Sequence, residues 1–272
     1  MNLPIGVIDS GVGGLTVAKE IARQLPKEQM IYIGDTDRCP YGSRPYEEVR
    51  RFTWQMIERL LQKKIKMLVI ACNTATAVIL EEARQKLSIP VVGVIHPGAI
   101  AALNHTVSKR VAVIGTEGTI SSGAYPEAIQ AFKEAKLRVT SLACPPFVPL
   151  VEQNRTSFSE AYNVVKETLK PLESVDFDTL ILGCTHYPLL KEVIQSAVGE
   201  HVKVISSGAE TAREVSMILQ HDRLSTTSEE EQENLYYTSG SVHAFRKTVS
   251  TWLEDSSVNI SPISFASSAM NQ

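Results

Sequence analysis

Short runs of Val, Ile and Leu alternate with longer amphipathic stretches along nearly the whole chain, and this alternation limits the possible folds most strongly. The runs carry few polar residues, which is typical of strands that helices cover on both faces. Between them, stretches such as 15–25 and 52–61 repeat apolar residues at helical spacing. This order predicts an α/β protein with parallel sheets. The predicted strands are 5–9, 30–34, 67–71, 91–95, 111–115, 138–142, 179–183 and 202–206.

A weak long-range repeat predicts two related α/β halves. IGVIDSGVGG at 5–14 resembles VAVIGTEGT at 111–119, and LVIACNTA at 68–75 resembles LILGCTHY at 180–187. The two patterns recur in the same order with similar separation, and their polar endings match. After the polar run 225–233, which predicts a loop, LYYTSG and VHAFRKTVSTWL predict one more strand and helix.

Composition restricts the class of protein and its partners. A chain of 272 residues is long enough for two domains, and 43% hydrophobic with 21% charged residues is typical of soluble globular proteins. The net charge of −3 argues against a nucleic-acid partner, because phosphate binding needs a concentrated basic face. The N-terminus lacks the pattern of a secretory signal, and no run approaches the roughly 20 apolar residues of a membrane span. We therefore expect a cytoplasmic protein without a membrane partner.

Four cysteines, Cys39, Cys72, Cys144 and Cys184, must each be interpreted singly. A cytoplasmic chain keeps its thiols reduced, so disulfides are not expected. None of the four forms a CxxC pair or has a histidine at zinc-finger spacing, so no metal site is predicted. Cys72 and Cys184 end equivalent strands of the two halves. Cys39 and Cys144 have no such equivalence, and we expect them to be bystanders.

Polar side chains follow several predicted strands directly. In parallel α/β sheets ligands bind outside the carboxyl ends of the strands, where helix N-termini offer free N–H groups to carboxylates. A substrate with two carboxylates and an ammonium group would suit such a cleft. Helix capping alone would explain the hydroxyl and amide residues, but not a cysteine before each cap. The residues at these ends are Asp9, Ser10, Cys72, Asn73, Thr74, Thr116, Cys184, Thr185 and His186.

The glycine-rich GVGG at 11–14 does not predict a nucleotide site. It lacks the GxGxxG spacing with a later acidic residue, and it lacks the GK[ST] ending of a P-loop. A tight turn between a strand and a helix is sufficient to explain these glycines.

Two thiols on facing halves suggest two acid/base groups on opposite sides of one bound molecule. Inversion of a stereocentre needs that arrangement, since one base removes the α-proton from one face and a conjugate acid protonates the other. A free thiol titrates near pH 8.5, so thiol and thiolate are both accessible near neutrality. Asp9 is placed to lie near Cys72, and His186 follows Cys184 by two positions.

At these residues the sequence resembles the glutamate racemases of the aspartate/glutamate racemase superfamily. The resemblance covers about residues 3–255, and the paired CNT and CTH motifs are specific together with the DSG start and the PYG loop. The matching segments are IGVIDSGVGGLTV (5–17), YIGDTDRCPYGSR (32–44), LVIACNTATA (68–77), PFVPLVE (146–152), LILGCTHYPLL (180–190) and YYTSGSVHAF (236–245).

The resemblance implies two α/β domains with the active site in the cleft between them. The first domain would span about 1–97 plus 208–272, and the second about 98–207. It also implies interconversion of L- and D-glutamate without metal, flavin or pyridoxal phosphate, which supplies D-glutamate for peptidoglycan. Members of the family often form homodimers, and we expect one here.

Residue roles follow from the same resemblance. Cys72 would take the proton from D-glutamate and Cys184 from L-glutamate. Asp9 would assist Cys72, while Glu152 and His186 would assist Cys184. The implied substrate contacts are Asp9, Ser10, Pro40, Tyr41, Gly42, Asn73, Thr74, Thr116, Thr119, Thr185 and His186.

Three alternatives stay open at the level of sequence. An aspartate racemase would share the two-thiol chemistry, although the CNT and CTH motifs favour glutamate. A hydrolase with a cysteine nucleophile would need only one essential thiol and would form an acyl intermediate. A two-lobed binding protein without catalysis would suit the architecture, and a lack of solvent deuterium exchange at the substrate α-carbon would support it.

Overall fold

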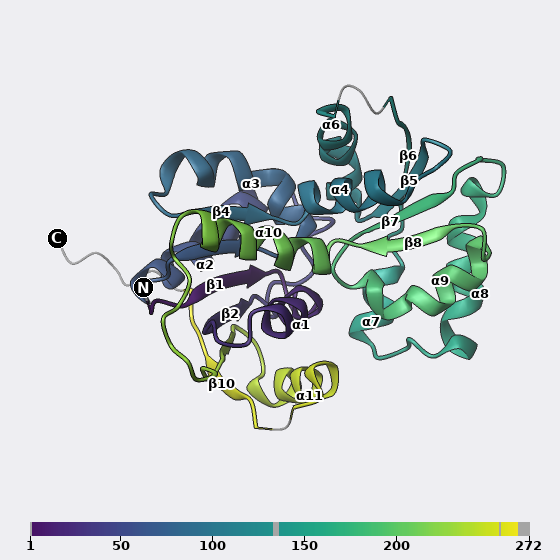
Figure 1. Ribbon diagram of the computed structural model, residues 1–272. Helices are drawn as coiled ribbons and strands as arrows, with labels where there is room; N and C mark the ends of the chain where they lie inside the picture. Colours follow the sequence, from purple (N-terminus) through teal and green to yellow (C-terminus); the bar gives the residue numbers. More distant parts are fainter. Residues whose placement is uncertain (1, 133–135, 256, 266–272) are drawn as a thin grey trace.

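Two parallel sheets form the framework of the computed structural model, which describes residues 2–132, 136–255 and 257–265 (Figure 1). The first sheet has the strand order β10-β9-β2-β1-β3-β4 and the second β6-β5-β7-β8. All strand pairs between the described residues are parallel. The strands are β1 (Ile5–Asp9), β2 (Met30–Gly34), β3 (Met67–Ile70), β4 (Val91–Gly93), β5 (Arg110–Gly115), β6 (Arg138–Ala143), β7 (Thr179–Gly183), β8 (Lys203–Ser206), β9 (Leu235–Thr238) and β10 (Asn259–Pro262).

Helices cover both faces of each sheet, as the apolar strands predict. Successive side chains of β3 point to opposite faces of the first sheet. Val69 packs against α1, α10 and α11 on one face, and Leu68 packs against α2 and α3 on the other. On the second sheet, α7, α8 and α9 cover one face while α4 and α6 cover the other. The helices are α1 (Leu15–Gln24), α2 (Tyr46–Gln62), α3 (Asn73–Lys86), α4 (Ile95–His105), α5 (Glu117–Ser121), α6 (Ala124–Gln130), α7 (Phe147–Glu152), α8 (Phe158–Leu169), α9 (Lys191–Val198), α10 (Gly208–His221) and α11 (Val242–Leu253), with the 3-10 turns η1 (Lys170–Leu172) and η2 (Tyr187–Leu190).

The predicted repeat is confirmed by the topology. The order β2-β1-β3-β4 in the first sheet recurs as β6-β5-β7-β8 in the second. The related segments of sequence are β1 with β5 and β3 with β7, which occupy the same two central places in their sheets. The carboxyl ends of these central strands therefore have equivalent positions in the two halves.

Two connections join the sheets. Helix α4 leads from β4 to β5, and α10 leads back from β8, packing on both α1 and α4 (Figure 1). The chain then adds β9 and β10 to the first sheet, so its C-terminal part returns to the first half. The domain limits of 1–97 plus 208–272 and 98–207 stay a prediction.

The predicted strands are all present, with small differences at their ends. The strand predicted at 91–95 ends at Gly93, because Val94 already precedes the first residue of α4. The predicted strand and helix near the C-terminus are confirmed as β9 and α11. Strand β10 was not predicted, since its sequence NISP is short and ends in proline, which strands tolerate mainly at sheet edges.

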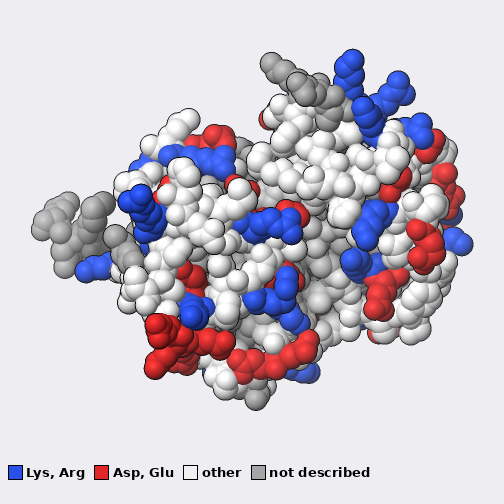
Figure 2. Space-filling view, viewed as in Figure 1, with Lys and Arg blue, Asp and Glu red and all other residues white. Residues whose placement is uncertain are grey.

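Charged side chains of both signs are interspersed over the face drawn in Figure 2. Acidic side chains gather at its lower left, where the chain between α10 and β9 carries the exposed Glu229, Glu230, Glu231 and Glu233. None of the helices in the described ranges combines the length and the apolar character that crossing a bilayer requires.

Candidate active site

A small cavity lies between the two sheets. The carboxyl ends of β1 and β3 in one half meet the loops after β5 and β7 of the other half there. Its free volume is about 10 Å³, room for roughly one water molecule, so the two halves lie closed over it. Every predicted substrate contact lines it except Asp9 and Thr119. The lining residues are Ser10, Pro40, Tyr41, Gly42, Cys72, Asn73, Thr74, Thr116, Val148, Cys184, Thr185 and His186.

Cys72 lies at the junction of β3 and α3. Its Sγ accepts the N–H of Ala75 and donates to Oγ of Ser10, both at 3.5 Å, so it caps the helix with its thiol. Burial and the nearby Asp9 carboxylate raise the pKa of this thiol to about 12. The resting group is therefore the protonated thiol, which is the form that can act as an acid.

Cys184 has a different set of neighbours. It follows β7, and its Sγ lies 3.8 Å from Nδ1 of His186. On the other side of the imidazole, Nε2 lies 2.6 Å from Oε1 of Glu152. Burial by itself would lower the pKa of His186, but the contacts with Cys184 and Glu152 outweigh it and raise that pKa to about 10. At neutral pH the imidazole is thus protonated and can donate from Nδ1 to the thiol sulfur.

Glu152 has the complementary behaviour. Burial would raise the pKa of its carboxyl, but the hydrogen bond and charge of His186 outweigh burial, and the pKa is lowered. The structure thus pairs the Glu152 carboxylate with the His186 imidazole beside Cys184, and the assistance of these two residues to Cys184 stays a prediction.

Asp9 lies next to the residues that line the cavity and forms hydrogen bonds with residues of both halves. It is fully buried, and Oδ1 accepts the N–H of Gly11 at 2.9 Å while Oδ2 accepts the hydroxyl of Thr185 at 3.3 Å. Burial raises the pKa of Asp9, and the positive charge of His186 partly opposes that rise. Asp9 therefore lies outside the lining of the cavity, where it interacts electrostatically with Cys72 and His186.

Three threonine hydroxyls meet across the cavity. Oγ1 of Thr74, at the start of α3, lies 2.9 Å from Oγ1 of Thr116 and 3.3 Å from Oγ1 of Thr119. The two partners come from the second half, where Thr116 caps α5 and lies 3.0 Å from Thr119. Hydroxyls beside the N-termini of α3 and α5 can donate hydrogen bonds to a carboxylate.

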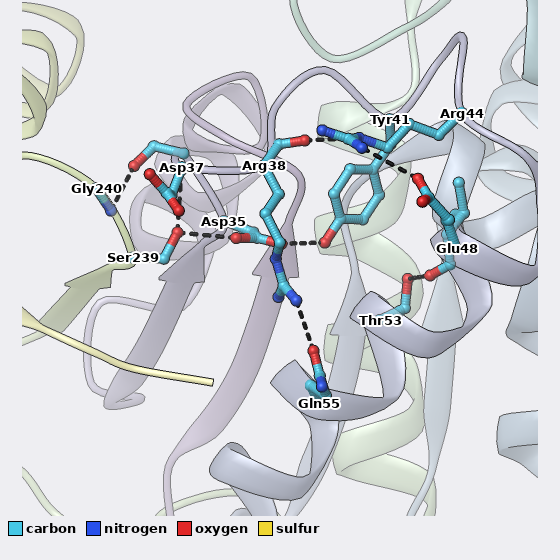
Figure 3. Close-up of polar contacts among 12 residues, drawn as sticks. Asp35, Asp37, Arg38, Tyr41, Arg44, Glu48, Thr53, Gln55, Ser239 and Gly240 are labelled. Carbon is cyan, nitrogen blue, oxygen red and sulfur yellow. Dashed lines mark hydrogen bonds and ion pairs between the residues drawn. The ribbon is translucent and has the colours of Figure 1, made fainter. Parts of the chain in front are cut away.

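The loop after β2 contributes Pro40, Tyr41 and Gly42 to the cavity, and Figure 3 shows the polar contacts that hold this loop. The phenol of Tyr41 donates to Oδ2 of Asp35, which also binds Nε of Arg38 at 2.7 Å (Figure 3). The hydroxyl of Tyr41 is thus engaged by Asp35, and its predicted contact with substrate stays a prediction. The carbonyl of Gly42 accepts the N–H of Gly118 at 2.8 Å, which brings this loop close to Thr116. Glycine is required at this position because an added Cβ would lie 2.5 Å from Cβ of Thr116.

Sequence reasoning missed two residues of this site. Tyr125 on α6 accepts a 2.9 Å hydrogen bond from Nδ2 of Asn73 and so orients that amide. Among the described residues, Oδ1 of Asn73 is buried without a partner, so it is available to a donor on a ligand. Val148 on α7 lines the cavity with an apolar surface. Neither residue follows a strand directly, and neither was among the contacts that the family resemblance implied.

The two remaining cysteines differ from each other. Cys144 is fully buried in the core of the second half, where its thiol contacts the carbonyl of Leu142 at 3.8 Å, as expected for a bystander. Cys39 was also expected to be a bystander, but its Sγ donates to Oε1 of Glu152 at 3.6 Å. Burial and the charge of Glu152 raise the pKa of Cys39 far above its usual range.

Fold and site together define an α/β protein of two related halves that place one thiol each at a shared cavity. A family model described as Asp/Glu/hydantoin racemase matches residues 5–215. The glutamate racemase of Bacillus cereus is 57% identical over 263 residues, which cover 97% of each chain. This chain belongs to the Asp/Glu/hydantoin racemase family.

Solved structures agree with this assignment. A glutamate racemase isoform from Bacillus anthracis superposes with a TM-score of 0.93 at 47% identity, covering 96% of this chain and 97% of that one. The glutamate racemase of Francisella tularensis, solved in complex with D-glutamate, has a TM-score of 0.90 at 33% identity, covering 97% and 98%.

Proposed function

We propose that this protein is a cofactor-independent racemase that interconverts L- and D-glutamate by a two-thiol proton transfer and supplies D-glutamate for peptidoglycan synthesis. One observation carries the proposal. Cys72 and Cys184 line the same small cavity from the ends of β3 and β7, the strands that the internal repeat relates. The two thiols thus approach a bound molecule from opposite halves of the protein.

The reaction needs no other reactant, because one thiol gains the proton that the substrate loses and the other thiol returns one. In the direction from L to D, the Cys184 thiolate takes the α-proton and becomes a thiol, while the Cys72 thiol protonates the opposite face of the carbanion and becomes a thiolate. The enzyme then holds the protonation state needed for the reverse direction, in which Cys72 is the base. Two positioned acid/base groups of this kind each contribute roughly 10²–10⁴-fold to rate.

The groups around the cavity match the charges of glutamate. The hydroxyls of Thr74, Thr116 and Thr119 and the free N–H groups at the start of α3 provide donors for carboxylates. Oδ1 of Asn73 is a buried acceptor without a partner among the described residues, and an ammonium group would satisfy it. We assign the ammonium to Asn73 and a carboxylate to the threonine hydroxyls.

The charged neighbours provide the two protonation states. His186 is protonated at neutral pH and lies against Cys184, where it favours negative charge on the sulfur. Asp9 lies near Cys72 and opposes negative charge there. This asymmetry supports Cys184 as the base and Cys72 as the acid toward L-glutamate.

Glutamate is favoured over aspartate by relatives that are more than half identical and are themselves glutamate racemases. The hydrolase alternative has less support, because a single nucleophile would leave the second thiol without a function. We further propose that the protein works in the cytoplasm as a homodimer. The need for two reduced thiols supports the location, since reducing compartments keep cysteines free, and the family resemblance supports the dimer, which sedimentation equilibrium would test.

Circular dichroism of L-glutamate, incubated with dialysed and chelator-treated protein, tests the proposed function. The signal should decay to zero and not invert, because the enantiomers have equal free energy. D-glutamate should decay to the same end point, and L-aspartate should decay far more slowly. Activity that returned only with pyridoxal phosphate or a metal would contradict the proposal, as would equal rates on aspartate.

A further inference from the structure

Three potential metal ligands meet at the edge of the cavity, and they come from three separate segments. Cys39 lies in the loop after β2, Glu152 ends α7, and His186 follows β7. Their donor atoms all lie within 4.8 Å of one another, with Sγ to Oε1 at 3.6 Å and Oε1 to Nε2 at 2.6 Å. Gly11 makes room for the cluster, since a Cβ there would lie 2.9 Å from the sulfur.

We propose that Cys39, Glu152 and His186 form an inhibitory site for a Zn²⁺-like divalent transition metal. Thiolate, imidazole and carboxylate are the ligands that zinc prefers, and three protein ligands with a water in the fourth position make a complete tetrahedral shell. The site is separate from the carboxylate and ammonium contacts assigned above, and it requires no metal for catalysis.

The observed distances are close to those that a metal needs. Zinc bonds of about 2.0–2.3 Å place tetrahedral ligand atoms roughly 3.3–3.6 Å apart. Sγ of Cys39 and Oε1 of Glu152 already have that separation, at 3.6 Å. The Glu152 carboxylate must move away from the imidazole by a fraction of an ångström, and its side chain, 36% exposed, is free to turn and open to solvent.

The charges of the cluster also suit a divalent cation. The cluster offers two groups that bind a metal as anions, the Cys39 thiol and the Glu152 carboxyl, and one that binds it as a neutral donor, the His186 imidazole. Binding displaces the thiol proton of Cys39, and the charge of the dication with its two anionic ligands sums to zero.

Metal binding would stop the proposed reaction for two reasons. It engages His186 and Glu152, the pair that lies beside Cys184 and is proposed to assist it. It also ties the loop after β2 in the first half to α7 and the loop after β7 in the second, which holds the cleft closed over the cavity. This inhibitory consequence rests on the proposed function, whereas metal binding itself does not.

Titration with Co²⁺, a spectroscopic substitute for Zn²⁺, tests the site independently of activity. One equivalent should produce the near-ultraviolet charge-transfer absorption of a cobalt–thiolate bond and the visible d–d bands of tetrahedral cobalt, and Zn²⁺ should abolish both. Cys39→Ser should lose this absorption, because a hydroxyl does not replace a thiolate ligand. Cys144→Ser, the matched control at a thiol outside the cluster, should keep it.

Two further measurements make the outcome decisive. Zn²⁺ should inhibit wild-type and Cys144→Ser racemisation equally, and Cys39→Ser should need at least tenfold more metal for the same fractional inhibition. In the wild type, Zn²⁺ should protect Cys39 from alkylation, as mapped by mass spectrometry, even if the variant folds poorly. Cobalt–thiolate absorption that persisted in Cys39→Ser, or vanished only in Cys72→Ser or Cys184→Ser, would overturn the site and leave the proposed racemase function intact.

Discussion

The hydroxyl of Thr185 donates a 3.3 Å hydrogen bond to Oδ2 of Asp9, directly below the cavity. Thr185 follows β7 in the second half, whereas Asp9 ends β1 in the first, so this buried contact joins the two sides of the site. A second bond, from Oγ1 of Thr16 to the carbonyl of Thr185 at 3.1 Å, reinforces it. The carboxylate near one thiol is therefore in direct contact with the residue that follows the other.

Asp9→Asn and His186→Asn should lower turnover unequally in the two directions. Each change removes a charge beside one thiol, so it disturbs one resting protonation state more than the other. The ratio of kcat/KM for the two enantiomers must stay at unity, since the equilibrium constant is fixed by the substrates. Circular dichroism progress curves from each enantiomer give these constants. Normal kcat in both directions for both variants would remove these residues from the mechanism.

Cys72→Ser and Cys184→Ser should each lose racemisation by at least about 10²-fold, because a hydroxyl is a far weaker acid than a thiol. Each variant should still eliminate from an amino acid with a leaving group at the β-carbon, since elimination needs only one base. Cys72→Ser should act on the L analogue and Cys184→Ser on the D analogue. Cys144→Ala, which alters a buried thiol outside the cavity, serves as the control and should still racemise. A shared enantiomer preference would refute the two-base arrangement.

Gly13→Ala should impair closure of the two halves. A Cβ at this position would lie 2.5 Å from Oγ1 of Thr185 and would also overlap the imidazole of His186. Overpacking of this kind costs about 1–3 kcal/mol, so kcat should fall and KM rise in both directions. Gly208→Ala is the matched control, because its Cβ would meet its nearest atoms, on Glu20 and Thr16, at an ordinary 3.4 Å. Kinetics of the two variants should therefore diverge, and equal behaviour would contradict this account.

The pair of His186 and Glu152 should make the free energy of unfolding depend on pH. The pKa of His186 is raised from 6.5 to about 10, so its contribution is complete below about pH 6.5 and is lost as pH rises toward 10. The lowered pKa of Glu152 gives a contribution present above about pH 4.5 and lost on acidification.

Denaturant unfolding of wild type and Glu152→Gln measures this dependence. The stability difference between them should be largest near pH 5.5 and should shrink by about pH 9.5. Glu254→Gln removes a partner from the exposed Lys19–Glu254 pair and should show a small difference that does not vary over this range. A difference for Glu152→Gln that grew with pH would show that the charge assignment is wrong.

Sequence alone determined the α/β class, the repeat and the pair of thiols. Buried parallel strands require continuous apolar runs, so β1, β3, β5 and β7 can be predicted from the sequence. Because all strands of a parallel sheet end at the same edge, residues that follow such runs must gather there. The placement of Cys72 and Cys184 at equivalent strand ends therefore followed from local pattern.

Only the tertiary structure decided how these residues contact one another. Strand patterns do not predict the hydrogen bonds that Tyr125, Cys39 and the phenol of Tyr41 form with distant residues or with the loop after β2. The bond between Asp9 and Thr185 joins residues 176 positions apart and depends on how the two sheets face each other. Local sequence controls where an element begins and which side is apolar, whereas the direction of a side chain across an interface is decided by packing between distant elements.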